Sequence, residues 1–469
     1  MLECTLIHAA DLHLDAPFRG VSDMLLSRGE SRASEKLLKL LRGATFTALE
    51  RLTDLCLREN ADALLLAGDV YNSAQSSLRA RLALRDAFLR LESAGVRVFL
   101  AHGNHDPLAE GVAAIPWPEN VTVFGTDLEA HSLERQGRTL ALIHGISHSG
   151  PKERANLARR FRHENPASAD SDIFHIGLLH CALTDLSGGH APYAPCSFSD
   201  LSESGMDYWA LGHIHSCRMF DRQGKLLDMP SGDRGTRETP LFRPFAAYPG
   251  SVQGLHVNET GPHGCLVLHL DGRGGLTARQ ATLAPAQWEI LHLELPQELE
   301  DIPSLESLLV HKLSTLAPRT TTGENCPNTE KTSEISCPPE AMLVRLCLTG
   351  RCSLNHELRG RGFIEDLGEH LNAELEGSGL WLRDIAIETR PLADIAVEAK
   401  RKDLAGEVLR RSRSLQDSPE ALALTAESCL APLFQRGKLR KLLPPPKEKE
   451  LAELAEEATL LCLGLLEGE

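Results

Sequence analysis

Five short polar motifs in the first half of the chain constrain its fold and chemistry more than any other feature. Each motif follows a short apolar run, where a β-strand would end, and each contains Asp, Asn or His. These side chains suit divalent ions such as Mn, Fe and Zn. Because open α/β sheets place their sites at the carboxyl ends of strands, we expect one shared site. The motifs are DLH at 11–13, GDVYN at 68–72, GNHD at 103–106, LLHC ending at Cys181, and GHIH at 212–215.

The hydrophobic pattern predicts the layers that carry these motifs. Strand signals alternate with amphipathic helices at 33–60 and 78–94. Strands dominate from residue 139 onward, and we expect them to form a second, largely antiparallel sheet. We therefore predict an α/β fold, a four-layer α/β/β/α sandwich over residues 1–285. A small α+β domain at 286–390 and a helical C-terminal extension at 391–469 complete the predicted organisation. A Gly- and Pro-rich loop at 229–244 and a polar insertion after Pro318 interrupt this pattern.

The charge balance limits how the protein could bind nucleic acid. The 469 residues include 49 Lys+Arg and 65 Asp+Glu, a formal net charge of −16. Bulk positive charge is therefore excluded as a means of binding, and a local basic surface would be needed. Arg19 is one candidate, and the basic segment at 151–163 is another. A solvated helix face is an equally good interpretation of the second.

The N-terminal region has no basic stretch followed by an apolar core, so the sequence predicts a cytoplasmic protein. No apolar stretch reaches the length of a membrane span without charges, and we expect no membrane association. The 12 cysteines are scattered and have no CxxC spacing, so we expect reduced thiols.

Seven side chains of the motifs make up the expected ligand set for two divalent ions: Asp11, His13, Asp69, Asn104, His180, His213 and His215. The simplest division gives one ion Asp11, His13, Asp69 and His215, and the other Asp69, Asn104, His180 and His213. Asp69 would bridge the two ions with its two oxygens. Two metals held side by side clamp the attacking and leaving oxygens of a phosphoryl displacement. Asp11 and His13 can serve one ion only if the backbone there leaves strand geometry.

His105 is left without a metal in this division, and we assign it a catalytic role. It would stabilise charge in the transition state or protonate the leaving oxygen. Asp106 is assigned beside it, because a carboxylate could fix the tautomer of the His105 ring. Two other histidines are interpreted structurally: His8 as a packing or hydrogen-bonding residue in an apolar run, and His263 as a surface loop residue.

The motifs resemble those of the calcineurin-like metallophosphoesterases over roughly residues 2–283. The segment DLHLDAPFRG at 11–20, with YPGSVQGLHVNETGPHGCLVL at 248–268, is similar to the SbcD-type DNA-repair exonucleases, particularly their YhaO-like branch. This resemblance implies a Mn-dependent nuclease acting on DNA ends. It also implies an SbcC-like coiled-coil ABC ATPase as partner, a homodimer, and a DNA-capping role for the domain at 286–390.

Two other functions remain open from the sequence. The first is a phosphodiesterase or phosphatase with a substrate other than DNA, although GDVYN differs from the GDxVDRG of protein phosphatases. The second is a scaffold subunit for an ATPase, which would not need a filled ligand set. The chain has no Walker A motif, so ATP use would require a second subunit.

Overall fold

The computed structural model describes most of the chain, and the ranges 1–2, 21–31, 73–76, 109–115, 162–172, 185–192, 228–240, 319–336, 393–398 and 435–445 lie outside the description. Beyond 445 only scattered residues are described. The predicted loop at 229–244 and the polar insertion after Pro318 therefore fall mostly outside the described residues. A basic run at 438–441 in the predicted C-terminal extension, a possible docking site for a protein partner, falls wholly outside them.

The chain divides into two compact units that are interleaved along the sequence. The first consists of Met1–Ile290, Leu313–Arg345 and Leu375–Arg383, and the second of Leu291–Lys312, Leu346–Glu374 and Asp384–Glu469. The division runs through three strands, so compact units and sequence segments do not coincide. The three predicted segments, with boundaries after 285 and 390, remain a prediction.

The first sheet has six strands in the order β12-β11-β1-β2-β3-β4. Strands β1 to β4 are parallel to one another, and β11 and β12 are added antiparallel at the β1 edge. The central strand β2 is apolar and buried along its whole length, as expected of a parallel strand covered on both faces. The strands are β1 (Glu3–Ala9), β2 (Ala63–Ala67), β3 (Arg97–Ala101), β4 (Val121–Val123), β11 (Gly264–Asp271) and β12 (Leu276–Thr282).

The second sheet also has six strands, in the order β5-β6-β7-β8-β10-β9. Its centre, β6-β7-β8-β10, is parallel, and β5 and β9 are antiparallel edges. The expectation of a largely antiparallel second sheet was therefore wrong, because the crossovers between these strands return the chain to the same end. The strands are β5 (Glu129–Arg135), β6 (Arg138–Ile146), β7 (Phe174–His180), β8 (Tyr208–Gly212), β9 (Arg218–Phe220) and β10 (Ala246–Tyr248).

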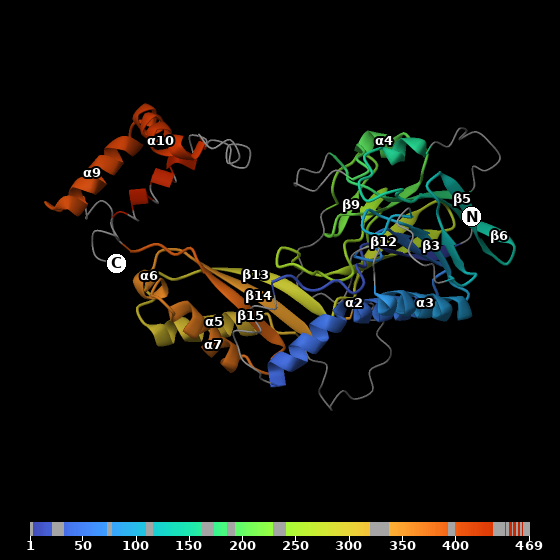
Figure 1. The fold of residues 1–469 in the computed structure, drawn as a ribbon, viewed down its shortest axis with the longest axis horizontal. Helices are drawn as coiled ribbons and strands as arrows, with labels where there is room; N and C mark the ends of the chain where they lie inside the picture. Colours follow the sequence, from blue (N-terminus) through green and yellow to red (C-terminus); the bar gives the residue numbers. More distant parts are fainter. Residues whose placement is uncertain are drawn as a thin grey trace. The chain divides into compact units, whose positions relative to one another are not determined.

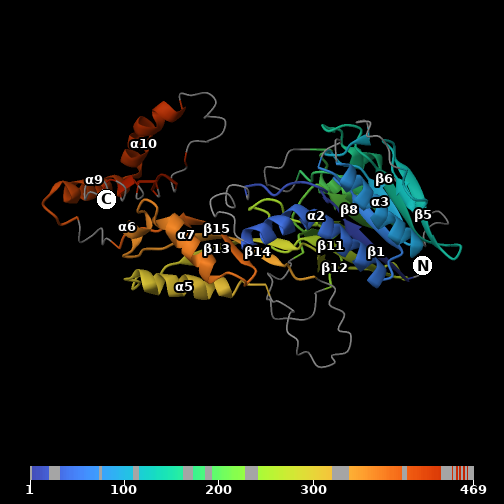
Figure 2. The same ribbon diagram turned by 60° about the horizontal axis from the view of Figure 1, so that its bottom comes forward.

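Successive side chains of a strand face opposite sides of the sheet, and so they pack in different layers. Leu65 of β2 packs with Ile143 and Ile176 in the core between the two sheets, whereas its neighbours Leu64 and Leu66 face the helices. Helices α2 (Arg32–Arg58) and α3 (Leu78–Ser93) cover that outer face of the first sheet (Figures 1 and 2).

The outer face of the second sheet has a thinner cover. Trp209 and Leu211 pack there against the 3₁₀ turn η2 (Leu157–Arg160) and the short helix α4 (Phe198–Ser202). The four-layer α/β/β/α prediction is confirmed. The basic segment at 151–163, however, forms a single 3₁₀ turn within its described part and not a long helix.

The remaining elements follow the sandwich in sequence. A three-stranded sheet has the order β13-β14-β15, and its strands are β13 (Ala286–Glu294), β14 (Ala341–Thr349) and β15 (Leu380–Ile387). The helices of this part of the chain are α5 (Ile302–Ser314), α6 (Asn355–Leu358), α7 (Phe363–Glu374), α9 (Leu404–Gln416) and α10 (Pro419–Phe434). Within the described part of the chain, no helix is both long and apolar enough to cross a membrane.

Candidate metal centre

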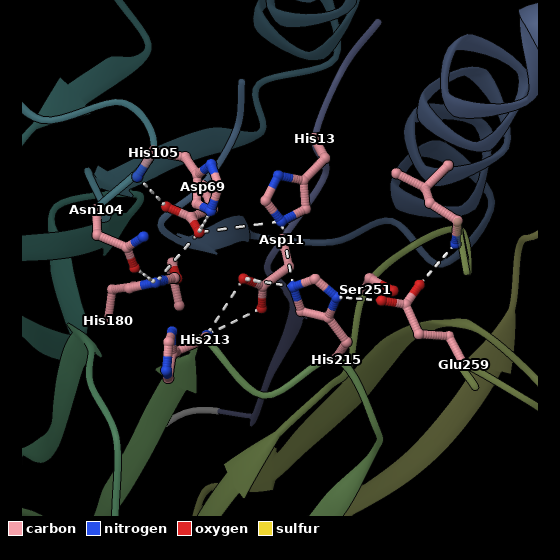
Figure 3. A network of polar contacts seen from close by, with 12 residues as sticks. Asp11, His13, Asp69, Asn104, His105, His180, His213, His215, Ser251 and Glu259 are labelled. Carbon is pink, nitrogen blue, oxygen red and sulfur yellow. Dashed lines mark hydrogen bonds and ion pairs between the residues drawn. The ribbon is translucent and has the colours of Figure 1, made fainter. Parts of the chain in front are cut away.

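The five polar motifs meet at one edge of the sandwich (Figure 3). The first sheet supplies the turns that follow β1, β2 and β3, and the second sheet supplies the ends of β7 and β8. All of these strands are parallel within their sheets, so their carboxyl ends lie at the same edge. The side chains that point toward one another there are Asp11, His13, Asp69, Asn104, His105, His180, His213 and His215.

The backbone departs from strand geometry at the ligand positions, as the spacing of Asp11 and His13 requires. Their φ angles are 51° and 42°, and those of Asp69 and His213 are 49° and 104°. Left-handed conformations at residues other than glycine carry strain and cluster at functional sites. The amide of Asp11 donates to the Gly68 carbonyl at 3.1 Å, and the amide of His13 donates to that of Asp69 at 3.0 Å. These bonds hold the first two motif turns together.

Glycines allow the two sheets to approach at this edge. A Cβ on Gly212 would lie 1.8 Å from the carbonyl oxygen of Ala67, which belongs to the other sheet. The same oxygen is 2.9 Å from Nδ1 of His180, so the close approach also orients a candidate ligand. The glycines of the motifs are therefore part of the site's construction.

One ligand group contains Asp11, His13 and His215, whose potential ligand atoms all lie within 4.8 Å of one another. The Nε2 atoms of the two histidines face each other at 3.2 Å, and Nε2 of His215 is 3.9 Å from Oδ1 of Asp11. Nε2 of His13 also lies 3.9 Å from Oδ2 of Asp69. Two imidazole lone pairs and carboxylate oxygens directed at one point fit a divalent cation.

A second group contains Asp11, Asp69 and His180. Nε2 of His180 is 3.4 Å from Oδ2 of Asp69 and 3.1 Å from Oδ1 of Asn104. The ring of His213 lies against that of His180, with centroids 5.3 Å apart. Oδ2 of Asp69 thus faces both groups, as a bridging ligand would. The division of the seven ligands between two ions remains a prediction.

Burial sets the electrostatics of these groups. It raises the pKa of Asp11 to about 6, against the lowering effects of His215 and the His213 amide, and raises the pKa of Asp69 well above its usual range. Burial likewise lowers the pKa values of His13 and His180. Two desolvated carboxylates beside neutral imidazoles would be relieved by a cation, which favours the deprotonated form of every ligand.

His105 lies at the site, with 41% of its side chain exposed. Its amide donates to Oδ1 of Asp69 at 2.9 Å, and its Nε2 is 4.0 Å from Oδ2 of that carboxylate. Its Nδ1 faces the carbonyl oxygen of Asn72 at 3.0 Å, so this backbone group orients the ring. The expectation that Asp106 would do so was wrong.

Asp106 instead connects two motif turns through its carboxylate oxygens. Its oxygens accept hydrogen bonds from the amides of Gly103 and Val70, each at 2.9 Å, and Oδ2 lies 3.3 Å from Nδ1 of His102. The carboxylate is buried, and His102 and both amides lower its pKa against the effect of burial. Its direct catalytic role remains a prediction.

Sequence reasoning assigned no role to Glu259, whose Oε1 lies 2.8 Å from Nδ1 of His215 (Figure 3). The only signal was its place in the segment at 248–268. His263 of the same segment is buried and contacts Ser251, so its assignment to the surface was wrong. His8 is buried as expected, with its ring nitrogens near the hydroxyl of Tyr208 and the carbonyl of Leu211.

The arginines that are candidates for binding nucleic acid differ in whether a carboxylate already neutralises their charge. Nε of Arg159 donates to Asp200 at 2.8 Å, and Arg160 donates to Asp127 at 2.6 Å. Arg19 is exposed. Burial and the charge of Arg19 act to lower the pKa of His215, but Glu259 and Asp11 raise it overall, so Arg19 lies within electrostatic reach of the first ligand group.

Comparison with known proteins gives this edge a family context. Residues 4–217 match the model of the calcineurin-like phosphoesterases. The chain is 37% identical to the uncharacterized metallophosphoesterase YhaO of Bacillus subtilis over 271 residues, 58% of each protein. It is 27% identical to the DNA double-strand break repair protein Mre11 of Aeropyrum pernix over 263 residues, 54% of each.

The chain thus spans little more than half the length of these two relatives. A solved structure of a dimetal phosphatase from Danio rerio aligns with 60% of this chain and 98% of its own, at 13% identity and a TM-score of 0.29.

Proposed function

We propose, from the match of residues 4–217 to the calcineurin-like phosphoesterases, that the chain is a two-metal DNA exonuclease that hydrolyses phosphodiester bonds in DNA repair. The observation that carries the proposal is the convergence of carboxylate, amide and imidazole ligands around Asp69. Two bound ions, proposed to be Mn, would supply an activated water and stabilise the charge of the phosphoryl transition state.

The chain's own residues have separate tasks in this proposal. The ligand side chains would hold the reaction centre, and a bound cation would favour the deprotonated form of the buried carboxylates. His105 is the exposed member, and its contact with Asn72 leaves Nε2 to face a substrate. In its protonated form that nitrogen would donate a proton to the leaving oxygen.

DNA is proposed as the substrate on two grounds. Relatives such as the Aeropyrum pernix protein carry the name of DNA double-strand break repair proteins. Arg19, exposed beside the first ligand group, could bind a phosphate of the nucleic-acid backbone. The ion pairs of Arg159 and Arg160 make the segment at 151–163 a weaker candidate.

We extend the proposal to a cytoplasmic location, as the sequence predicts, and to partners, on the basis of the family resemblance alone. The protein would act in the cytoplasm as a homodimer with an SbcC-like coiled-coil ABC ATPase, and the domain at 286–390 would cap the DNA. The described cysteines have no disulfide between them, which is compatible with that location.

Digestion of end-labelled linear DNA by the purified chain tests the function. Reactions with Mn, with Mg and with chelator are compared, and Asp69→Ala and His105→Ala serve as inactive controls. Shortening of the DNA that requires Mn and is abolished by both substitutions is the expected result. Hydrolysis of a small phosphodiester without DNA cleavage, also in the presence of an SbcC-like ATPase, would replace the DNA proposal by a different phosphodiesterase.

A further inference from the structure

We propose that Glu259 is a positioning residue that holds His215 in the tautomer and orientation needed to bind one of the two ions; this inference rests on the proposed metal-dependent function. Oε1 of Glu259 lies 2.8 Å from Nδ1 of His215. Since a carboxylate accepts, Nδ1 carries the proton. Nε2 is thereby left as the ligand atom, and it faces His13 at 3.2 Å.

The Glu259 carboxylate is itself fixed in place. Its Oε2 accepts the amide of Leu255 at 2.6 Å and that of His256 at 3.3 Å, so both oxygens are engaged. Only 22% of the side chain is exposed.

The loop that carries Glu259 is also tied to His215 through its backbone. The amide of Ser251 donates to the carbonyl of His215 at 3.0 Å. The buried ring of His263 joins the two ends of the loop, with Nδ1 2.9 Å from Oγ of Ser251 and Nε2 3.1 Å from the carbonyl of Glu259. His215 is therefore held at its backbone and at its ring by one loop.

A carboxylate behind a ligand histidine changes metal binding at that histidine. It fixes the ring and makes the ligand nitrogen more basic, and removing such a partner typically lowers metal affinity about 10- to 100-fold. His180 has a backbone carbonyl in the corresponding place, at 2.9 Å from Nδ1. The buried Nδ1 of His13 has no hydrogen-bond partner within the described residues. The effect of Glu259 should therefore fall on one ion.

A matched pair elsewhere in the chain separates this role from general stabilisation. Oε2 of Glu129 lies 3.1 Å from Nε2 of His131, and its Oε1 accepts the amide of Gly125 at 3.0 Å. This pair has the same chemistry, a histidine and a backbone amide on one carboxylate, but no candidate ligand takes part. Glu129→Ala and Glu129→Gln are the corresponding controls.

The test is a titration of the metal-free full chain with Mn²⁺ alone. Calorimetry measures the affinity of each equivalent, and electron paramagnetic resonance distinguishes a spin-coupled pair from isolated Mn²⁺. Wild type should bind two Mn²⁺ and show the spectrum of a spin-coupled pair. In Glu259→Ala one equivalent should bind about 10- to 100-fold more weakly, so that isolated Mn²⁺ appears at intermediate concentrations. Glu259→Gln, which keeps an acceptor but loses the charge, should have a smaller effect in the same direction. Both Glu129 variants should match wild type.

Unchanged affinity for both equivalents in the Glu259 variants would overturn the inference, and so would an equal loss at both. If Glu259→Ala does not fold, as judged by circular dichroism, the Gln variant decides. A wild type that binds two Mn²⁺ but cleaves no DNA, also in the presence of an SbcC-like ATPase, would end the nuclease proposal and leave this inference supported or overturned by the titration. A wild type that binds no Mn²⁺ would overturn both.

Discussion

The two sides of the candidate metal centre are built differently. His180 ends a fully buried strand, and its Nδ1 contacts a backbone carbonyl of the facing sheet. His215 lies in a turn, has 33% of its side chain exposed, and contacts the side chain of Glu259. The side of the centre with His180, here called the strand side, therefore depends on how closely the two sheets pack. The side with His215, here called the loop side, depends on the side chain of Glu259, which one substitution can remove. Substitutions on the strand side should lower both the stability of the fold and metal binding, and substitutions on the loop side should lower metal binding alone.

The largest expected effect comes from breaking the strand side at Gly212. A Cβ there would overlap the Ala67 carbonyl at 1.8 Å, and backbone cannot move aside as a side chain can. We expect Gly212→Ala to lower the free energy of unfolding by about 3 kcal/mol, the upper range for overpacking, and to abolish Mn²⁺ binding. Urea denaturation and calorimetry measure the two effects. Gly43→Ala in α2, where a Cβ meets nothing within 4 Å, should be neutral or stabilising.

Asp106 should come next, because it joins the turns that present Asp69 and Asn104. Asp106→Ala leaves the buried amides of Gly103 and Val70 without their acceptor. We expect a loss of about 2 kcal/mol in unfolding free energy and weaker binding of both Mn²⁺ equivalents. A variant of normal stability that still binds both ions but has lost catalysis would instead support a direct catalytic role for Asp106.

The buried ring of His8 makes the stability of the strand side depend on pH. Burial lowers its pKa to about 3 from an ordinary value of 6.5, against the effect of the Leu211 carbonyl, so folding favours the neutral ring. Its stabilising contribution is complete above about pH 6.5 and is lost as the pH falls toward 3, because the unfolded chain binds the extra proton.

Replacing this residue should reduce the acid sensitivity of folding. We expect His8→Gln to remove up to about 1.4 kcal/mol per pH unit from the slope of unfolding free energy between pH 6.5 and 4. Urea denaturation at a series of pH values measures it. Equal slopes in wild type and variant would show that other groups control the acid response.

The smallest effect is expected at Arg19, on the loop side. Arg19→Ala should leave folding unchanged, weaken DNA binding, and reduce the salt dependence of the binding constant by about one unit. Arg159→Ala is the control, since this side chain is already paired with Asp200. A change in the salt slope for Arg159 and none for Arg19 would move the proposed DNA contact to the second sheet.

Much of this centre could be predicted because local sequence carries the relevant chemistry. Apolar runs ending in Asp, Asn or His located the strand ends, and parallel strands bring such ends to one edge. The departure of Asp11 and His13 from strand geometry followed from their spacing alone, and their positive φ angles confirm it. The contacts of His105 and Asp106 could not be predicted, because Asn72 and Val70 come from another turn.

The sequence by itself determined the candidate ligand types, the strands that carry them and the four-layer class, because these depend on residue identity and short-range periodicity. Only the tertiary structure decided which group contacts the Nδ1 atom of each candidate ligand histidine. Glu259 is 44 residues from His215 along the chain, and Ala67 is 113 residues from His180. Contacts over such separations depend on how loops and sheets pack, and hydrophobic pattern does not encode which polar atoms then meet. The same packing brought Gly212 against Ala67, and this close approach of two backbones places the Ala67 carbonyl where it contacts His180.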